Sequence, residues 1–452
     1  MKPPKLFSRL HARIGDFWWY SLMLFCACRA ADLLNAFVGL WLVPKYVDPS
    51  ELGAVMPLTQ FANFLAIPVA AFANTFRNEL TRLSIGKEFG KLKTLMRGVF
   101  AATAVFLFVA IIVARFVLPA FLERIRIVEG SLGLVIIAAS FVSAVAPIYS
   151  NALQALKKFK AQSILSIVGA PVRLIAMLLA MPFRAITGYF IGQAAVPVFT
   201  IGASVIALRK ELAVKADPYW NRATVKKFSA LLAVFLSWGL ATGFYGLVES
   251  TIIRQRLPDL DSAGYYMATR FSEIATYLYG AMIFAFFPFA AELAKNGREY
   301  ARLILKSTGV NMAFCAAIAV AFGIVARPLL AFLPHGDKYA AYWWAVPWLI
   351  SITGISSLHG FYTTAEIAAN RFSFLKWCLP LDLLYPASLL LVTGHGYLAG
   401  HIPESWSAFL TEHNVYSLKT MLWWMTTINT AKAVACLLAM YFTSRRKHQQ
   451  NK

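Results

Sequence analysis

The stretch Asp261–Leu293, DSAGYYMATRFSEIATYLYGAMIFAFFPFAAEL, places two opposite charges inside a segment that is otherwise apolar enough to lie in lipid. At 100° per residue, these two charges and two tyrosines share an arc of about 60° on one helix face. The four residues are Tyr266, Arg270, Glu273 and Tyr277. A charge at bilayer depth costs roughly 3 kcal/mol or more, and helices that carry one normally turn it toward protein or a watery cavity. We therefore predict that this helix lines a cavity.

The rest of the chain is equally apolar. It has 452 residues, of which 59% are hydrophobic and 14% charged, with a mean hydropathy of +0.62, too high for a soluble protein. Windows of about 20 apolar residues, enough to cross the hydrocarbon core, recur throughout. We predict an all-α polytopic membrane protein with about 12 spans. They cover residues 17–43, 53–76, 95–118, 131–155, 163–181, 186–208, 229–251, 261–293, 305–333, 341–363, 374–393 and 418–443.

The net charge of +22 is distributed unevenly over the gaps between these spans. One alternate set of gaps, which includes both chain ends, holds 29 Lys and Arg residues, and the other set holds 8. Basic loops stay on the cytoplasmic side of a membrane. The charge therefore predicts cytoplasmic N- and C-termini, and it needs no nucleic acid to explain it.

The spans fall into two related halves. We expect a basic N-terminal segment along the cytoplasmic headgroups, two lobes of six spans each with a cytoplasmic loop between them, and a basic tail. The basic N-terminal segment covers residues 1–16, the two lobes cover 17–208 and 229–443, the loop between them covers 209–228, and the tail covers 444–452. Aligning Gly53 with Gly264 also aligns Met56 with Met267. Parallel repeats of this kind are one layout of transporters whose substrate site lies between the lobes, around a central cavity.

Further polar residues lie within the predicted spans. Arg29, Asp32 and Asn35 share an arc of about 120° in the first span, and Arg173 lies near the middle of the fifth. Other candidates for the cavity are Gln60, Asn63, Trp238, Tyr245, Glu249 and Asp382. We interpret Arg173 and Lys432 either as ligands or as hydrogen-bond donors between helices. Glu249 and Asp382 are candidates for Na⁺ or H⁺ coupling or for charge pairing, and Asp382 has no partner that the sequence identifies.

The sequence indicates no cofactor. All five cysteines lie in apolar stretches without metal-ligand spacing, and no glycine-rich loop with a following Lys-Ser or Lys-Thr is present. Energy for transport would therefore come from an ion gradient, the membrane potential or the substrate's own gradient.

Three motifs carry a resemblance to a known family. The order Asp261-Ser-Ala-Gly-Tyr-Tyr-Met-Ala-Thr-Arg270, closed by Phe287-Pro-Phe-Ala-Ala-Glu-Leu293, resembles the eighth helix of polysaccharide and lipid-linked oligosaccharide flippases. These belong to the multidrug/oligosaccharidyl-lipid/polysaccharide exporter superfamily. Arg327-Pro-Leu-Leu330, followed by Gly336 and Tyr339, resembles the end of the family's ninth span, and Asn151–Lys160 resembles its basic connection between helices four and five.

This resemblance implies a function. Similar proteins move undecaprenyl-linked sugar precursors across the bacterial inner membrane by alternating access, through two lobes around a cationic cavity. Arginines on the first and eighth helices of related flippases serve the substrate's phosphates, which implies that role for Arg29 and Arg270, with Arg173 as a third candidate. Six amide and aromatic side chains would then contact the sugars: Asn35, Gln60, Asn63, Trp238, Tyr245 and Tyr266. The implied partners are the lipid-linked glycan, membrane lipids and a polysaccharide polymerase or ligase.

Three alternatives stay open at this point. A cation-coupled multidrug exporter of the same superfamily has the same expected fold. A membrane glycosyltransferase would place an acidic residue in the first external loop, where Asp48 and Glu51 lie, although turn and capping chemistry also favours these residues. Finally, Arg29–Asp32 and Arg270–Glu273 are both i, i+3 pairs, so each could be a neutral structural pair rather than a ligand site.

Overall fold

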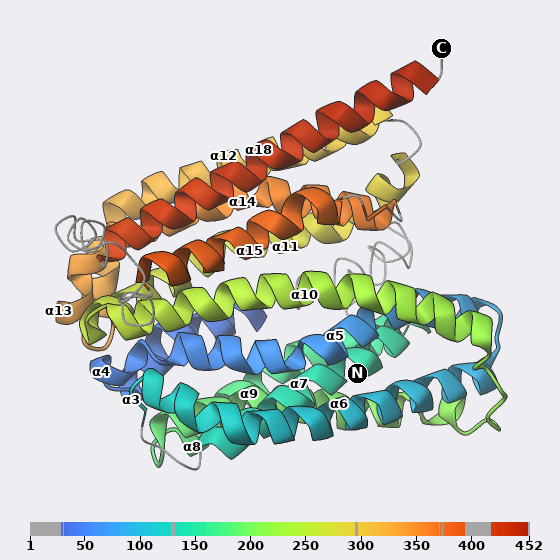
Figure 1. The fold of residues 1–452 in the computed structure, drawn as a ribbon. Coiled ribbons are helices and arrows are strands. Elements are labelled where there is room, and N and C mark those ends of the chain that lie inside the picture. Colours follow the sequence, from blue (N-terminus) through green and yellow to red (C-terminus); the bar gives the residue numbers. More distant parts are fainter. Residues whose placement is uncertain are drawn as a thin grey trace, which may run out of the picture. The chain divides into compact units, whose positions relative to one another are not determined.

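The computed structural model describes residues 29, 31–127, 132–156, 158–293, 297–369, 371–372, 374–393 and 417–450 (Figure 1). This part of the chain is all-helical and contains no strand. Its eleven long helices are α5 (Val55–Ile85), α6 (Phe89–Arg124), α7 (Leu132–Ala155), α8 (Phe159–Ala180), α9 (Ala185–Leu212), α10 (Arg222–Arg256), α11 (Asp259–Leu293), α12 (Gly297–Phe332), α14 (Ala345–Ala368), α15 (Phe374–Thr393) and α18 (Leu418–Gln450). The predicted basic segment 1–16 lies outside the described residues.

The first span ends in an irregular helical stretch. Residues 31–37 are helical and continue into the π-helix η1 (Val38–Leu42) and the short α3 (Val43–Tyr46). Pro44 lies in the first turn of α3 and has no N–H to donate, so the regular hydrogen-bond ladder is interrupted here. Short helices then lead to the neighbouring elements: α4 (Pro49–Leu52) before α5, and α13 (Gly336–Tyr339) with the 3₁₀ helix η2 (Ala340–Tyr342) before α14.

Several helices extend beyond the predicted spans. α5 continues to Ile85 instead of ending at residue 76, and α10 begins at Arg222 instead of 229. Charged residues beyond the apolar part of a helix can continue its backbone. Arg82 and Glu79 on α5 form an i, i+3 ion pair of 2.6 Å, which stabilises this extension. The loop between α9 and α10 is therefore residues 213–221, shorter than the predicted 209–228.

Seven helices of the described chain are long and apolar enough to cross a membrane, judged by length and composition. They are Pro49–Ala73, Phe89–Arg124, Leu132–Ala155, Lys160–Ala180, Ala185–Leu212, Arg222–Arg256 and Glu299–Phe332. Together with the all-helical fold they confirm a polytopic membrane protein. The assignment of the remaining helices as spans stays a prediction.

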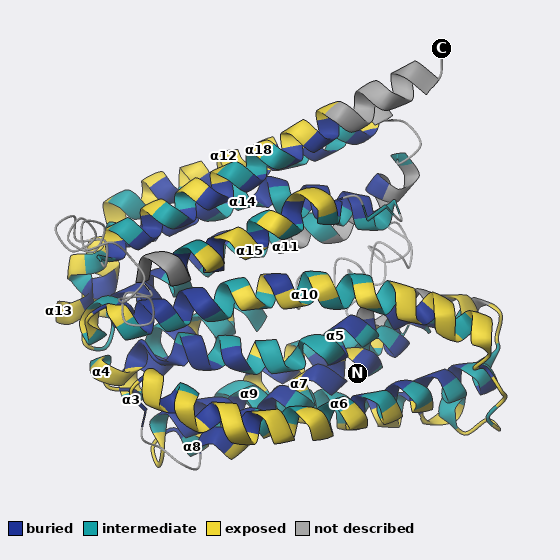
Figure 2. Ribbon diagram, viewed as in Figure 1, coloured by how far each residue is buried: buried dark blue, intermediate teal, exposed yellow. Residues whose placement is uncertain are grey.

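The chain forms two compact units, and the first consists of Met1–Val38, Leu65–Ala120 and Glu129–Gly239. Within this unit 1, α9 packs along both α7 and α8. Its core is a continuous apolar cluster that includes Phe76, Leu80 and Ile148, all fully buried. By contrast, Phe108 and Phe116 on α6 are 66% and 78% exposed, and much of α6 is yellow in Figure 2. An apolar outer surface of this kind suits contact with lipid.

The second unit consists of Gly39–Phe64, Phe121–Val128 and Leu240–Lys452. Within this unit 2, α14 is the central helix, since it packs against α11, α12, α15 and α18. Two segments of the first half of the chain, 39–64 and 121–128, belong to unit 2. The two units are defined by contacts between residues, whereas the predicted lobes 17–208 and 229–443 are consecutive parts of the chain. The assignment of the lobes therefore stays a prediction.

Candidate functional site

Unit 1 contains a cavity of about 410 Å³ between its helices. The first helix contributes Asp32 and Asn35 to its lining, and α8 contributes Arg173. The remaining lining residues come from the first helix and from α7, α8 and α9: Ala31, Ser143, Ser150, Gln162, Leu165, Ser166, Gly169, Ala170, Gln193, Val196, Pro197 and Thr200. We call this the unit 1 cavity. Three residues predicted from the sequence, Asp32, Asn35 and Arg173, therefore line one cavity.

The charged side chains of the unit 1 cavity are held by specific contacts. Arg173 donates a hydrogen bond of 2.6 Å from Nη1 to Oδ1 of Asn35. Asp32 forms an ion pair of 3.0 Å with Arg29 one helical turn away, and both side chains are about one quarter exposed. The one acidic residue in the lining is thus matched by an arginine. The predicted role of Arg173 as a donor between helices is confirmed, and the same residue lines the cavity.

Much of the remaining lining is polar. Serine and threonine hydroxyls and the side-chain amides of Gln162 and Gln193 face the same cavity as Arg173. Gln193 is oriented by a hydrogen bond of 2.7 Å from its Nε2 to the hydroxyl of Tyr189. These residues were not among those predicted from the sequence, although a signal was present. Ser143 and Ser150 are seven residues apart in an apolar helix, and so are Gln193 and Thr200, which places each pair on one face.

Arg270 and its predicted neighbours form a second group, which lies in unit 2. The Nη1 atom of Arg270 contacts both carboxylate oxygens of Glu273, at 2.8 and 3.0 Å. Its guanidinium carbon lies 4.9 Å from the centre of the Tyr266 ring, and the Tyr266 hydroxyl donates to the carbonyl of Gly39 at 3.2 Å. The polar face predicted for Asp261–Leu293 is therefore organised around an intrahelical ion pair.

Gly39 lies directly against the side chain of Arg270. A β-carbon at this position would lie 2.9 Å from Cδ of the arginine, closer than real side chains approach. Met56 completes the surroundings, with its sulfur 4.0 Å from Nη2. The arginine side chain is 16% exposed and that of Glu273 is 35% exposed, so the pair remains partly accessible.

A third group of predicted residues is buried among α10, α11, α15 and α18 of unit 2. Tyr265 donates a hydrogen bond of 2.6 Å to Glu249, whose side chain is buried. Asp382, for which the sequence indicated no partner, forms an ion pair of 2.6 Å with Lys432, and His359 lies 3.9 Å away. Tyr245 stacks on Tyr385 with ring centres 4.4 Å apart.

The remaining predicted sugar ligands lie elsewhere. Gln60 packs beside Gly246 in unit 2, and Asn63 is exposed on α5. Trp238 is half-buried on the part of α10 that belongs to unit 1, outside the lining of the unit 1 cavity. Their role in binding stays a prediction. Within the described residues, no group of three or more His, Cys, Asp and Glu side chains is arranged to hold a metal ion.

The protein matches known proteins by its structure but not by its sequence. No family model matches the sequence, and no curated protein matches it either. Solved structures do match, over almost the whole chain. An inward-facing multidrug resistance MATE family transporter of the MOP superfamily has a TM-score of 0.66 at 11% identity, covering 94% of this chain and 98% of that one.

Two further structures have the same architecture. A Vibrio cholerae MATE transporter, solved as a D35N mutant, gives a TM-score of 0.62 at 14% identity and covers 98% of this chain and 99% of its own. A MOP superfamily transporter from Pyrococcus furiosus gives 0.63 at 11% identity and covers 98% of both chains. For that transporter, a binding pocket of reverse polarity suggests a different function. The protein therefore has the MATE-type fold of MOP superfamily transporters.

Proposed function

We propose that the protein is an alternating-access flippase that moves a lipid-linked oligosaccharide, of the undecaprenyl-pyrophosphate type, across the bacterial inner membrane for surface polysaccharide synthesis. The observation that carries this proposal is the lining of the unit 1 cavity. It combines one guanidinium with two glutamines, one asparagine and several hydroxyls, and its one carboxylate, Asp32, is paired with Arg29. A sugar phosphate needs this set of partners.

The chemistry of each component supports that substrate class. Arginine offers a planar fork of N–H donors that suits phosphate oxygens. Amide and hydroxyl side chains form hydrogen bonds in both directions, as sugar hydroxyls require. An apolar organic cation would find few matching groups here, and Asp32, the carboxylate best placed to attract it, already pairs with Arg29.

The multidrug alternative rests on a different observation, the similarity of the fold to MATE transporters. One fold supports many functions, so this similarity does not select the substrate. Glycosyl transfer is the less favoured reading, because the neighbours of this fold are transporters. We further propose that both termini are cytoplasmic and that a polysaccharide polymerase or ligase uses the product. Transport would be coupled to Na⁺ or H⁺ or driven by the substrate gradient.

The test uses the purified protein in liposomes with an undecaprenyl-pyrophosphate-linked disaccharide that carries a fluorophore on its sugar. Quenching by dithionite from outside reports which leaflet holds the sugar. We expect protein-dependent equilibration of the two leaflets, and no new covalent product. Efflux of ethidium without movement of the lipid would instead identify a drug exporter, and a product of altered mass would identify an enzyme.

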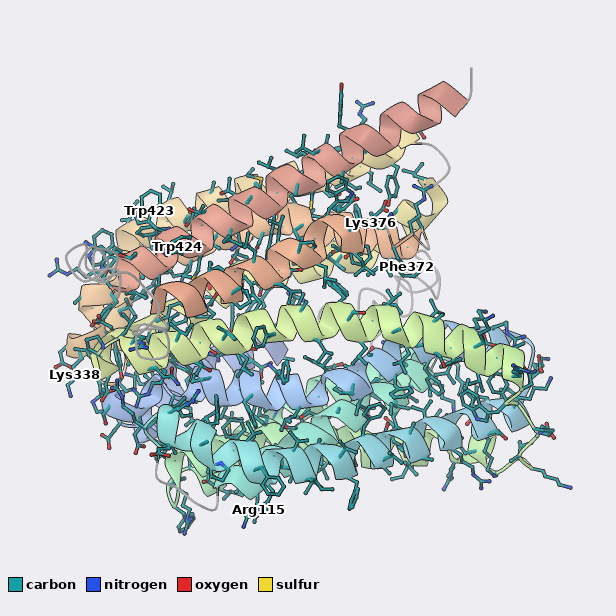
Figure 3. All side chains as sticks on the ribbon, in the orientation of Figure 1. Arg115, Lys338, Phe372, Lys376, Trp423 and Trp424 are labelled. Carbon is teal, nitrogen blue, oxygen red and sulfur yellow. The ribbon has the colours of Figure 1, made fainter. Side chains whose placement is uncertain are left out.

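Arg173→Ala tests the site itself. Losing one charge-assisted hydrogen bond costs about 1.5–3 kcal/mol, so flipping should slow by about tenfold or more. Arg115→Ala is the matched control, since Arg115 is an exposed arginine on α6 of the same unit (labelled in Figure 3). We expect Arg29→Ala and Arg270→Ala to abolish flipping at unchanged protein level. Normal flipping in all three variants would refute the phosphate role of these arginines.

A further inference from the structure

One carboxylate oxygen in unit 2 accepts hydrogen bonds from two arginines that are far apart in the sequence. Oδ1 of Asp259, at the start of α11, lies 2.7 Å from Nη1 of Arg126 and 2.8 Å from Nη1 of Arg254. Arg126 follows α6 in the first half of the chain, and Arg254 belongs to the last turn of α10. We call these three residues the Asp259 clasp.

The clasp is reinforced by two hydrogen bonds to backbone carbonyls. Arg126 donates from Nη2 to the carbonyl of Gln255 at 2.9 Å, and Arg254 donates from Nε to the carbonyl of Ile125 at 3.1 Å. Each arginine thus reaches across to the other's segment. Arg126 holds a φ of 62°, which is uncommon for a residue other than glycine. The turn after α6 therefore has a left-handed backbone conformation at the residue whose side chain reaches Asp259.

The surrounding contacts join the same parts of the chain. Gly53 packs so closely on Ser262 of α11 that a β-carbon would lie 1.7 Å from its hydroxyl oxygen. Phe61 stacks on Phe121 with ring centres 4.7 Å apart. These contacts explain why residues 39–64 and 121–128 belong to unit 2, while the rest of the first half of the chain belongs to unit 1.

One ion pair of the clasp, between Arg126 and Asp259, can break and re-form because both side chains are partly exposed. Arg254 is only 2% exposed, but Arg126 and Asp259 are 49% and 40% exposed. Water can therefore replace the contact between Arg126 and Asp259 at little cost, because half-exposed ion pairs contribute modestly to stability. Arg254 stays on its own helix pair, since Asp259 follows it by only five residues. The contact that can be exchanged is the one from the first half of the chain to the second.

We propose that the Asp259 clasp closes a gate at this end of the helices and must break each time the transporter opens there. This end carries the gaps with few Lys and Arg residues, so it is the predicted external end. The inference rests on the proposed alternating access, but it concerns the gate and not the substrate. Removing the charge of Asp259 shifts the protein toward the state that is open at this end.

The test measures access to Ser262, which is 1% exposed beside the clasp. Ser262→Cys is introduced with and without Asp259→Asn, and labelling by a membrane-impermeant maleimide is followed in intact cells, after subtracting the signal of the native cysteines. We expect the labelling rate to rise about fivefold or more with Asp259→Asn. Loss of charge-assisted hydrogen bonds should shift the equilibrium between the closed and the open gate toward the open state by about this factor. Arg126→Gln should act in the same direction.

Two controls separate gate opening from general loosening. Arg256→Ala removes an exposed arginine of the same helical turn and should leave labelling unchanged. Asn311→Cys, at a fully buried position on α12, should stay unlabelled in the Asp259→Asn background. Unchanged labelling at Ser262→Cys, or an equal rise at Asn311→Cys, would overturn the proposal. Because labelling needs no substrate, this result is independent of the flipping assay.

Discussion

Arg173 on α8 and Asn35 on the first helix are joined by a hydrogen bond of 2.6 Å, and both side chains line the unit 1 cavity. The amide oxygen accepts the bond and is itself uncharged, so it orients the guanidinium without neutralising it. Arg173 thereby places a planar positive group in the lining of the cavity, and a guanidinium fork suits the oxygens of an anionic ligand. The pair therefore fixes the position of the one guanidinium in the lining of the unit 1 cavity.

Asn35→Asp tests this relationship with a change of nearly constant shape. A carboxylate at this position would neutralise the guanidinium, and we expect flipping of the lipid-linked disaccharide to slow by about tenfold or more, as loss of a charged hydrogen bond implies. The liposome quenching assay measures this rate. Asn221→Asp, the same chemical change at an exposed asparagine outside the lining of the cavity, is the control and should have no effect. Equal rates in the Asn35→Asp variant and the wild type would contradict the interpretation.

Hydropathy predicted the all-helical class and the order of the helices, because each span depends mainly on its own apolar residues. It could not predict the helix ends at Ile85 or Arg222, since hydropathy reports where lipid ends and not where backbone hydrogen bonds end. The site was predicted in part. Arg173 and Asn35 were both candidates, but they are 138 residues apart, and only tertiary packing places them together.

The partner of Asp382 shows the same limit. Both Asp382 and Lys432 were recognised as charges in the middle of spans, yet nothing local indicated that α15 and α18 would bring them within 2.6 Å. Periodicity fixes the face of one helix, whereas a contact between helices depends on how two faces meet. The serine and glutamine pairs of the unit 1 cavity were a missed local signal, because their seven-residue spacing was visible in the sequence.

Lys432→Met should destabilise the protein strongly, because it leaves the carboxylate of Asp382 uncompensated in a buried site. Both side chains are less than 10% exposed, and breaking such a pair typically costs about 3–5 kcal/mol. Thermal unfolding in detergent measures the loss as a lower Tm. The double variant Lys432→Met/Asp382→Leu should recover most of it, since no charge is left buried. A double variant no more stable than the single one would contradict this account.

Glu79 gives a dependence of stability on pH at the predicted cytoplasmic end of α5. Burial alone would raise the pKa of Glu79, but hydrogen bonds from Arg82 and Tyr219, with the charges of Arg82 and Lys227, hold the pKa below its ordinary value. A carboxyl with a lowered pKa stabilises the folded state above its unfolded pKa, about 4.3, and this contribution is lost as the pH falls through the folded value.

We therefore expect Glu79→Gln to lower Tm at pH 7 and to have a smaller effect at a pH below about 4. Comparing the Tm difference between wild type and variant at the two pH values cancels the acid sensitivity of the remaining carboxyls. Glu123→Gln, a change of the same kind at an exposed glutamate of α6, serves as the reference. A Tm difference that is the same at pH 7 and at a pH below about 4 would show that the charge of Glu79 is not what stabilises this contact.

Gly188→Ala should disturb the turn that positions the beginning of α9. A β-carbon at Gly188 would lie 2.5 Å from the backbone nitrogen of Met181 and 2.6 Å from the carbonyl carbon of Ala180, and backbone atoms cannot rotate away. Overpacking of this kind costs about 1–3 kcal/mol. Gly202, on the same helix, has open space around its position, so Gly202→Ala should instead stabilise by up to about 1 kcal/mol through helix propensity.

Both variants replace a glycine of α9 by alanine, so a lower Tm for Gly188→Ala than for Gly202→Ala reports mainly the packing at the α8–α9 turn. The shift has a functional consequence as well, because Gln193 lies five residues after Gly188 and lines the unit 1 cavity. Gly188→Ala should therefore slow flipping even at a temperature where the variant remains folded, whereas Gly202→Ala should not. If both variants are equally stable, the close approach of α9 to the preceding turn does not exist in the folded protein.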